Sequence, residues 1–223
     1  MTTIAEIQSL EEANPKIIRR SEIEGAVIRG FAKQCGLTTY IDFGCWVGLL
    51  AQQALKDGDF ERAILVDAVG ACLSKTAAKV NPGVAAQYHQ VAVVADPDSR
   101  SFQVPVQDTS CAGFGQPGLT IDVSQVEVGW FLRSLNVDLS RTYLKIDLEG
   151  LDLRIATRLH RIGQLPRVLH IEFTTDAQFQ YLFSLLNDRY AFPVRKSGHM
   201  FYSMALSKER GVLIGFDPDC AYS

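Results

Sequence analysis

Short apolar runs alternate with amphipathic segments over most of the chain after residue 36. Five runs rich in β-branched and aromatic residues predict buried strands at 38–43, 62–68, 86–94, 142–148 and 167–173. Helical spacing between most of them predicts helices over 47–56, 71–80, 151–162 and 176–190. Alternating strands and helices are typical of a parallel sheet with helices on both faces. The pattern therefore predicts a doubly wound α/β domain.

Two segments depart from this alternation. Residues 96–127 are rich in turn-forming residues and hold two strand-like runs, 102–107 and 119–128, which indicate an insertion or a hairpin. Near the C-terminus, the runs 199–206 and 211–216 are joined by the polar segment SKER. We expect them to form an antiparallel hairpin that completes the sheet.

The first 36 residues have a helical pattern and predict an N-terminal extension of the domain at 37–223. Capping-box spacing at Thr3 and Glu6, and again at Ser21 and Glu24, predicts two helices that are separated at Asn14-Pro15. We expect the second helix to cover an edge or the mouth of the domain through an apolar stripe of Ile23, Ala26, Val27, Gly30 and Phe31. No internal repeat or linker is present, so 37–223 is predicted to be one globular unit.

Composition narrows the class of protein. With 47% hydrophobic residues among 223, the chain builds a sizeable core, and its formal charge of −3 argues against a nucleic-acid partner. No run has the length of a membrane span, and the N-terminus lacks the apolar block of a signal peptide. The five cysteines show no CxxC spacing, which favours reduced thiols in a cytoplasmic protein and disfavours zinc. Self-association stays open.

Polar residues gather where the predicted strands end. Because ligands bind beyond the carboxyl ends of parallel strands, these residues are the candidate site. They are Asp42, Gly44 and Gly48 after the first strand, Asp67 after the second, Lys145, Asp147 and Glu149 at the fourth, and His170 and Glu172 at the fifth.

The turn after the first strand, IDFGCWVG, indicates the kind of cofactor. A pyrophosphate normally requires the three glycines of GxGxxG, whereas this turn has the spacing D-x-G-x-x-x-G. Asp67 ends the next strand 23 residues after Gly44, where an acid accepts hydrogen bonds from a ribose diol. The pattern favours S-adenosyl-L-methionine, whose carboxylate and ammonium suit backbone groups and Asp42, over NAD.

The segment KIDLEGLD, at 145–152, adds charged groups beside the predicted cofactor. Strand alternation places Lys145, Asp147 and Glu149 on one side if the strand persists that far. Two acids flanking a leucine cannot both cap the helix that follows. At least one of them is therefore available to bind or deprotonate an acceptor hydroxyl.

These motifs resemble those of FkbM-type methyltransferases. KIDLEGLD is similar to their K-I-D-V-E-G-A-E signature and IDFGCWVG to their D-I-G-A-N-x-G turn, with Cys45-Trp46 in place of Ala-Asn. The resemblance covers roughly residues 37–175. It implies a class I, Rossmann-like, mostly parallel seven-stranded sheet, S-adenosyl-L-methionine as donor, and O-methylation of a hydroxyl on a saccharide or natural product.

The resemblance also implies roles for individual residues. Asp42, Gly44 and Gly48 would bind the methionine part and Asp67 the ribose, while Asp147 and Glu149 would face the methyl group or the acceptor. Candidate bases are Asp147, Glu149, Glu172, His89 and His170.

Three alternatives stay open. The acids Asp147, Glu149 and Glu172 could together hold Mg²⁺, which prefers oxygen ligands, although no metal is the simpler expectation. The chain could be a non-catalytic binding protein that keeps the methyltransferase fold. It could also be an NAD-dependent oxidoreductase, which is disfavoured because no Tyr-x-x-x-Lys spacing occurs.

Overall fold

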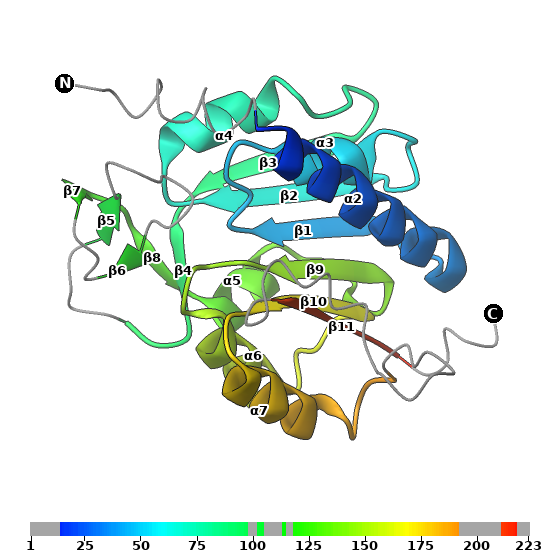
Figure 1. Cartoon of the computed structure of the whole chain (residues 1–223), viewed down its shortest axis with the longest axis vertical. Coiled ribbons are helices and arrows are strands. Elements are labelled where there is room, and N and C mark those ends of the chain that lie inside the picture. The colour runs from blue at the N-terminus through cyan, green and yellow to red at the C-terminus, as the bar shows by residue number, and fades with distance from the viewer. Residues whose placement is uncertain (1–13, 98–101, 105–112, 115–117, 192–210, 218–223) are drawn as a thin grey trace.

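A six-stranded sheet in the order β11-β10-β9-β1-β2-β3 forms the centre of the molecule (Figure 1). The structure is a computed structural model and describes residues 14–97, 102–104, 113–114, 118–191 and 211–217. The strands are β1 Thr39–Phe43, β2 Arg62–Asp67, β3 Ala85–Gln90, β9 Thr142–Ile146, β10 Val168–Phe173 and β11 Gly211–Phe216. All neighbouring strands pair in parallel except β11, which runs antiparallel to β10.

The mostly parallel α/β sheet confirms the predicted fold class. The antiparallel direction of β11 agrees with the predicted end of the sheet. The strand predicted at 199–206 lies outside the described residues, so the hairpin and the count of seven strands stay predictions.

Helices cover both faces of the sheet and divide its core in two. On one face, side chains of α5 Val128–Ser134, α6 Asp152–Arg161 and α7 Asp176–Leu186 pack on strand residues such as Ile41, Ile64 and Leu144. On the other face, α2 Pro15–Cys35, α3 Leu49–Leu55 and α4 Gly70–Ala77 pack on residues such as Tyr40 and Leu65. Alternation along each strand sends successive side chains to opposite helical layers, which is why the inner strands are mostly buried and apolar, whereas the edge strand β3 is mostly exposed.

The predicted strand 86–94 is wrong in its continuity, because the chain leaves the central sheet after β3. Residues Ala92–Val94 form β4, which pairs in parallel with β8 Gln125–Glu127. The Ala92 N–H donates to the Ser124 carbonyl at 2.9 Å, and β4 is buried whereas β3 is mostly exposed. Burial against a second cluster therefore redirects the backbone at Val91.

The segment between β4 and α5 forms a small additional sheet. Its strands are β5 Phe102–Val104, β6 Gly113–Phe114 and β7 Leu119–Ile121, with β5 antiparallel to both neighbours. The expected insertion with paired strands is thus present. The strand predicted over 119–128 is divided into β7 and β8. Helix α5 then begins at Val128, because the Glu127 carboxylate accepts the Trp130 N–H at 2.7 Å as its N-cap. The short 3₁₀ helix η2, Leu139–Arg141, then leads into β9.

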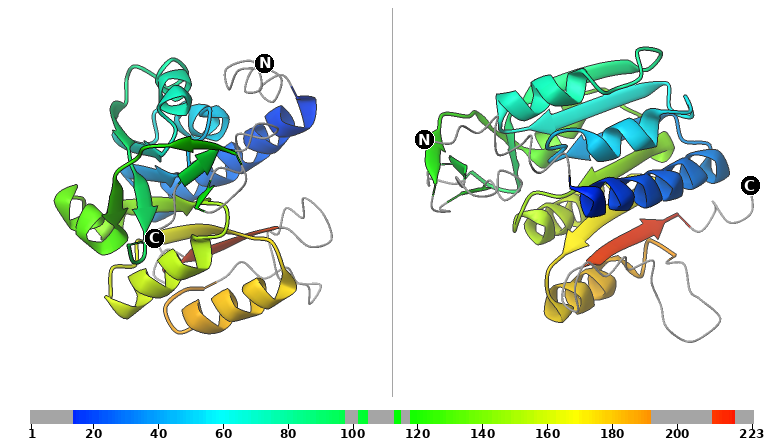
Figure 2. Two further views of the ribbon diagram at one scale, coloured as in Figure 1. Left: turned by 90° about the vertical axis from the view of Figure 1, so that its left-hand side faces the viewer. Right: turned by 45° about the horizontal axis from the view of Figure 1, so that its top comes forward.

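Helix α2 lies across the molecule between α3 and β11 (Figure 2). It begins at Pro15, with Asn14 as the N-cap, so the predicted start at Ser21 is wrong. The first predicted helix lies outside the described residues.

The predicted apolar stripe of α2 is right only in part: Val27 and Phe31 pack on the core, whereas Ile23 is 45% exposed. The buried stripe is Ser21, Glu24, Gly25, Ile28, Ala32 and Cys35. Gly25 explains this rotation: a Cβ there would lie 2.4 Å from the Gln53 Cβ, so its absence lets α2 approach α3 closely. None of the described helices has the length and apolarity to span a bilayer.

Candidate functional site

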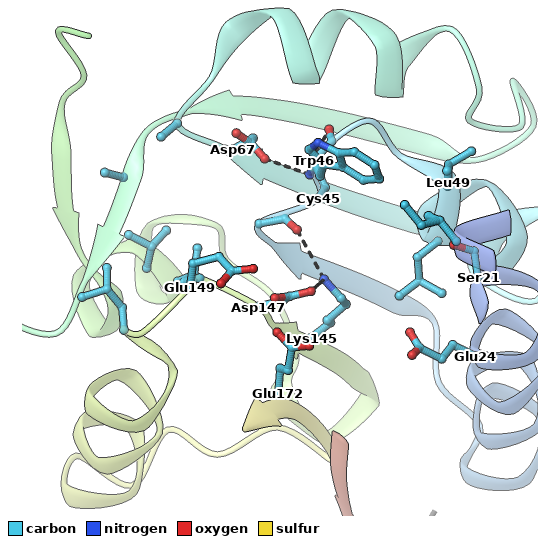
Figure 3. A pocket seen from close by; sticks show the side chains of 18 of the residues that line it. Ser21, Glu24, Cys45, Trp46, Leu49, Asp67, Lys145, Asp147, Glu149 and Glu172 are labelled. Carbon is cyan, nitrogen blue, oxygen red and sulfur yellow. Dashed lines mark hydrogen bonds and ion pairs between the residues drawn. The ribbon is translucent and has the colours of Figure 1, made fainter. Parts of the chain in front are cut away.

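A cavity of about 470 Å³ opens at the carboxyl ends of β1, β2, β9 and β10 (Figure 3). We call it the cleft. The strand order reverses between β1 and β9, which is where ligands bind in open α/β sheets. The first turns of α2 supply a further wall through Ile17, Arg20, Ser21 and Glu24. This confirms the expectation that the N-terminal extension covers the mouth of the domain.

The turn between β1 and α3 forms one wall of the cleft and is held in left-handed conformations. The backbone φ angles are +82° at Gly44, +47° at Trp46 and +75° at Gly48. Such a φ is uncommon for a bulky residue such as Trp46 and persists only where the surroundings enforce it. Here the Trp46 carbonyl accepts the Thr76 hydroxyl at 2.9 Å, and its N–H is bound to Asp67.

The two glycines also permit close backbone approaches. A Cβ at Gly44 would lie 1.9 Å from the Asp147 carbonyl oxygen, and a Cβ at Gly48 would lie 2.7 Å from the Thr76 Cα. Gly44 is therefore where the turn after β1 meets the end of β9. Glycine is required at both positions by conformation and by space.

Cys45 lies in this turn and borders the cleft, although its side chain is only 5% exposed. Its side chain is buried, with Sγ 3.8 Å from the Thr76 hydroxyl. Burial, with Asp67 and Asp42 nearby, raises the pKa of the Cys45 thiol well above its usual value. A neutral buried thiol is a poor nucleophile, so Cys45 is a packing residue.

Asp67 lies at the end of β2 and lines the cleft opposite Glu172 (Figure 3). Its Oδ2 accepts the Trp46 N–H and its Oδ1 accepts the Val69 N–H, both at 2.8 Å. Burial raises the pKa of Asp67 to about 7 despite these two donors. Each carboxylate oxygen keeps a second lone pair, so Asp67 can still accept hydrogen bonds from a ligand diol.

Lys145 links the turn after β1 to the end of β9. Its Nζ donates to Asp42 Oδ1 at 3.0 Å and to the Gly44 carbonyl at 3.3 Å, and lies 3.2 Å from Asp147 Oδ2. The Tyr40 hydroxyl donates to the other Asp42 oxygen at 2.9 Å. Burial disfavours the ammonium, but Asp147 and Asp42 outweigh it and raise the pKa of Lys145 above its usual value. Lys145 is a fixed cation and not a base.

Three carboxylates, which we call the acid triad, gather on the side of the cleft away from Asp67. Asp147, Glu149 and Glu172 each place an oxygen within 4.8 Å of the others. Burial raises the pKa of Asp147, but Lys145, then a hydrogen bond with Glu172 and the charge of Arg20, outweigh it and lower this pKa to about 2. Asp147 is therefore held ionised.

The loop that carries Glu149 is shaped by a residue outside the cleft. Glu149 and Gly150 have φ angles of +45° and +98°. The buried Asp152 carboxylate accepts the N–H groups of Leu148 at 2.9 Å and Gly150 at 3.1 Å. Because Asp152 binds these backbone donors, Glu149 is left to line the cleft.

Helix α2 contributes two charged residues that the sequence analysis missed. Arg20 Nε lies 2.6 Å from Glu24, and its Nη2 lies 3.4 Å from Glu172 on β10. Arg20 thus links the N-terminal helix to the acid triad. The spacing of Ile17, Ser21, Glu24 and Ile28 follows one helix face and could have indicated it.

Neither candidate histidine lines the cleft. His170 is buried, with Nδ1 2.9 Å from the Tyr143 hydroxyl, and burial together with Lys145 lowers its pKa to about 3. His89 packs edge-on against Phe131, with ring centroids 5.3 Å apart. Neither imidazole is therefore placed in the cleft to act as a base.

The predicted site residues therefore fall into two sets. Gly44, Asp67, Asp147, Glu149 and Glu172 line one cleft. Asp42 and Gly48 lie behind its wall: Asp42 is 1% exposed and hydrogen-bonded to Lys145 and Tyr40, and Gly48 packs on Thr76.

Comparison with known proteins identifies the fold. No protein-family model matches the chain, and no curated protein matches it by sequence. Among solved structures, the plantazolicin methyltransferase BpumL in complex with SAH superposes with a TM-score of 0.51 at 9% identity, covering 96% of this chain and 90% of that one. The chain therefore has the fold of S-adenosylmethionine-dependent methyltransferases.

Two further solved structures are less similar. The methyltransferase domain of bacterial CtHen1 gives a TM-score of 0.45 at 11% identity, covering 88% of this chain and 98% of that one. A SAM-dependent methyltransferase from Leishmania major gives 0.47 at 10% identity, covering 91% and 74%.

Proposed function

We propose that the protein is an S-adenosylmethionine-dependent methyltransferase that methylates a hydroxyl on a saccharide or natural-product acceptor. One observation carries the proposal. A left-handed glycine turn and the carboxylate of Asp67 at the end of β2 lie across a single cleft from three other carboxylates, in a fold shared with an SAH-bound methyltransferase. The O-methylation rests further on the resemblance of KIDLEGLD to the FkbM signature.

The cofactor is assigned to the wall formed by the turn after β1 and the end of β2. Gly44 and the backbone of its turn would hold the methionine part, and Asp67 would accept from the ribose hydroxyls. Beside Asp67 the cleft is lined by apolar Ala68, Val91 and Phe102, a surface suited to an adenine ring. Asp42 and Gly48 support this wall from behind, and Asp147 marks its boundary with the acceptor.

The acceptor is assigned to the acid triad. The bound cofactor supplies an activated methyl group, so the protein must align the acceptor hydroxyl and remove its proton. Alignment contributes roughly 7–11 kcal/mol in favourable cases, and a positioned base about 10²–10⁴-fold. Asp147 is a weak base because its pKa is about 2, so it is assigned to orienting the hydroxyl. Glu149 is the proposed base, and Glu172, which hydrogen-bonds to the ionised Asp147, is assigned with it to orienting the hydroxyl.

A divalent cation is a second way for the same residues to act. Hard cations such as Mg²⁺ bind carboxylate oxygens, and the triad offers three within 4.8 Å of one another. The close pairing of Asp147 with Lys145 disfavours this role, since it already balances one charge. We therefore propose proton abstraction without a metal and treat Mg²⁺ as the alternative.

Transfer of an isotopically labelled methyl group from S-adenosylmethionine to a panel of hydroxylated acceptors tests the proposal. We expect labelled product from the wild type and a loss of about 10²-fold or more in turnover by Glu149→Gln. Turnover that persists in the presence of EDTA would exclude the Mg²⁺-dependent alternative. Binding of SAH with no transfer to any acceptor would instead support a non-catalytic binding protein, and the proposed activity would be wrong.

A further inference from the structure

A second hollow, which we call the arginine groove, lies beside α6 and has a volume of about 330 Å³. Its charged lining consists of three arginines and one aspartate, so it is cationic although the whole chain carries a formal charge of −3. The remaining lining residues include Ala95 after β4 and Tyr181 on α7. The groove is thus enclosed by three separate parts of the chain.

The three arginines lie on one face of α6. Arg154, Arg158 and Arg161 are spaced i, i+4 and i+7, so their side chains emerge on the same side of the helix. The opposite side, with Ile155, Ala156 and Leu159, is buried in the core. Like charges at this spacing repel one another, so the cluster is unfavourable for the helix unless anions balance it.

The described residues balance this charge incompletely. Arg158 Nε lies 2.8 Å from Glu127, which also caps α5, and Arg154 lies 3.6 Å from the largely exposed Asp96. Arg161 forms no side-chain hydrogen bond or ion pair within the part of the chain that the structure describes. One guanidinium is therefore unpaired among these residues, and another is held by a long, solvent-exposed contact.

The arginine groove lies close to the cleft. A small hollow between them shares Glu149 and Glu172 with the cleft and Leu153 with the arginine groove. A molecule whose hydroxyl reaches the acid triad would extend over the start of α6 toward the arginines. The cleft and the groove are thus neighbouring hollows on either side of the start of α6.

We propose that the arginine groove binds a phosphate group. Guanidinium groups bind phosphate oxygens through paired N–H donors, and two of them can contact one group from adjacent helical turns. If the phosphate is part of the methyl acceptor, the inference rests on the proposed function. Binding of a phosphate to the groove does not itself depend on methyl transfer.

Calorimetry with inorganic pyrophosphate at 0.15 M NaCl tests the groove directly. The wild type is expected to bind one equivalent saturably, with and without SAH. The Arg154→Gln/Arg161→Gln double variant should bind at least about tenfold more weakly. Arg141→Gln, which changes an exposed arginine that directly precedes the central strand β9 and does not line the groove, should bind like the wild type. Arg158 is left in place because its partner Glu127 caps α5.

Three results would overturn the proposal: no saturable binding, equal affinity in the double variant, or displacement of pyrophosphate by SAH. An unchanged melting temperature of the double variant excludes a folding defect. We expect none, because the loss of exposed ion pairs rarely destabilises a protein. A hexose 6-phosphate that binds more tightly than inorganic phosphate assigns the group to an acceptor, and equal affinities assign it to a free anion. SAH binding is measured separately, so failure of the cofactor assignment is distinguishable from failure of the groove.

Discussion

The two walls of the cleft are built in different ways. The cofactor wall, from Gly44 to Gly48 with Asp67, is set by backbone geometry: left-handed residues, close approaches and N–H groups bound to a carboxylate. The acceptor wall, formed by the acid triad with Arg20 and Glu24, is set by charges on four separate segments, namely α2, the end of β9, the loop after it, and β10.

Because of this difference, substitutions in the two walls should have different effects. Substitutions in the cofactor wall displace the backbone and so affect folding and cofactor binding together. In the acceptor wall, a substitution at Glu149 changes charge at a partly exposed side chain and should leave the fold and the cofactor in place. Gly44 and Lys145 are the points where the walls meet, and their substitution should have the largest effects on stability.

The largest expected effect is that of Gly44→Ala. The new Cβ would lie 1.9 Å from the Asp147 carbonyl oxygen, and the alanine would also have to adopt a φ of +82°. We expect a loss of more than about 4 kcal/mol in the free energy of unfolding, since overpacking and left-handed strain add. Urea denaturation followed by circular dichroism measures it.

Gly58→Ala is the matched control. Gly58 has a φ of +73°, but no heavy atom lies within 4 Å of the position that a Cβ would take. Only the conformational strain of about 1–2 kcal/mol therefore applies. Similar losses in the two variants would show that the walls are not in close contact at Gly44.

Lys145→Met should have the next largest effect. It leaves Asp42 buried without its cation, and breaking a buried pair costs about 3 kcal/mol or more. Lys33→Met removes a lysine whose side chain is 65% exposed and 3.6 Å from Asp59, and it should cost less than about 1 kcal/mol. Equal melting temperatures for the two variants would contradict the account of Lys145 as the link between the walls.

The pH dependence of SAH affinity distinguishes the walls more finely. The pKa of Asp67 is about 7 because of burial, so the carboxylate is increasingly protonated below pH 7 and a protonated group accepts fewer hydrogen bonds. SAH affinity should therefore fall by up to about tenfold for each pH unit below 7. Titration calorimetry between pH 5.5 and 8 measures this affinity, and its loss below pH 7 should disappear in Asp67→Asn. If the loss of affinity persists in this variant, the group that is protonated near pH 7 is not Asp67.

The contrast between the walls also explains which features could be predicted from sequence. The cofactor wall is one continuous turn plus an acid at a fixed separation, so IDFGCWVG and Asp67 indicate it without tertiary information. The strand ends that carry Asp147, Glu149 and Glu172 were likewise visible in the apolar pattern. Alternation of strands and helices places these strand ends at one edge of a parallel sheet, whereas the pairing of β1 with β9, which brings them together, is given only by the strand order of the structure.

The rest depends on contacts between distant segments. Arg20 and Glu24 lie on a helix whose buried face is centred by the contact of Gly25 with Gln53, so apolar spacing alone places this face only in part. Asp42 has the sequence signature of a ligand-binding acid, yet Lys145 and Tyr40 bury it behind the wall. The separation of β4 from β3 likewise depends on pairing with β8, more than 30 residues away.

The central claim is that the cofactor wall binds S-adenosylmethionine independently of the acceptor wall. Calorimetry with SAH on the wild type, Asp67→Ala and Glu149→Gln tests it most directly. We predict binding by the wild type, affinity at least about tenfold weaker for Asp67→Ala, and affinity within about threefold of the wild type for Glu149→Gln. No binding by the wild type, or equal losses in both variants, would contradict the claim.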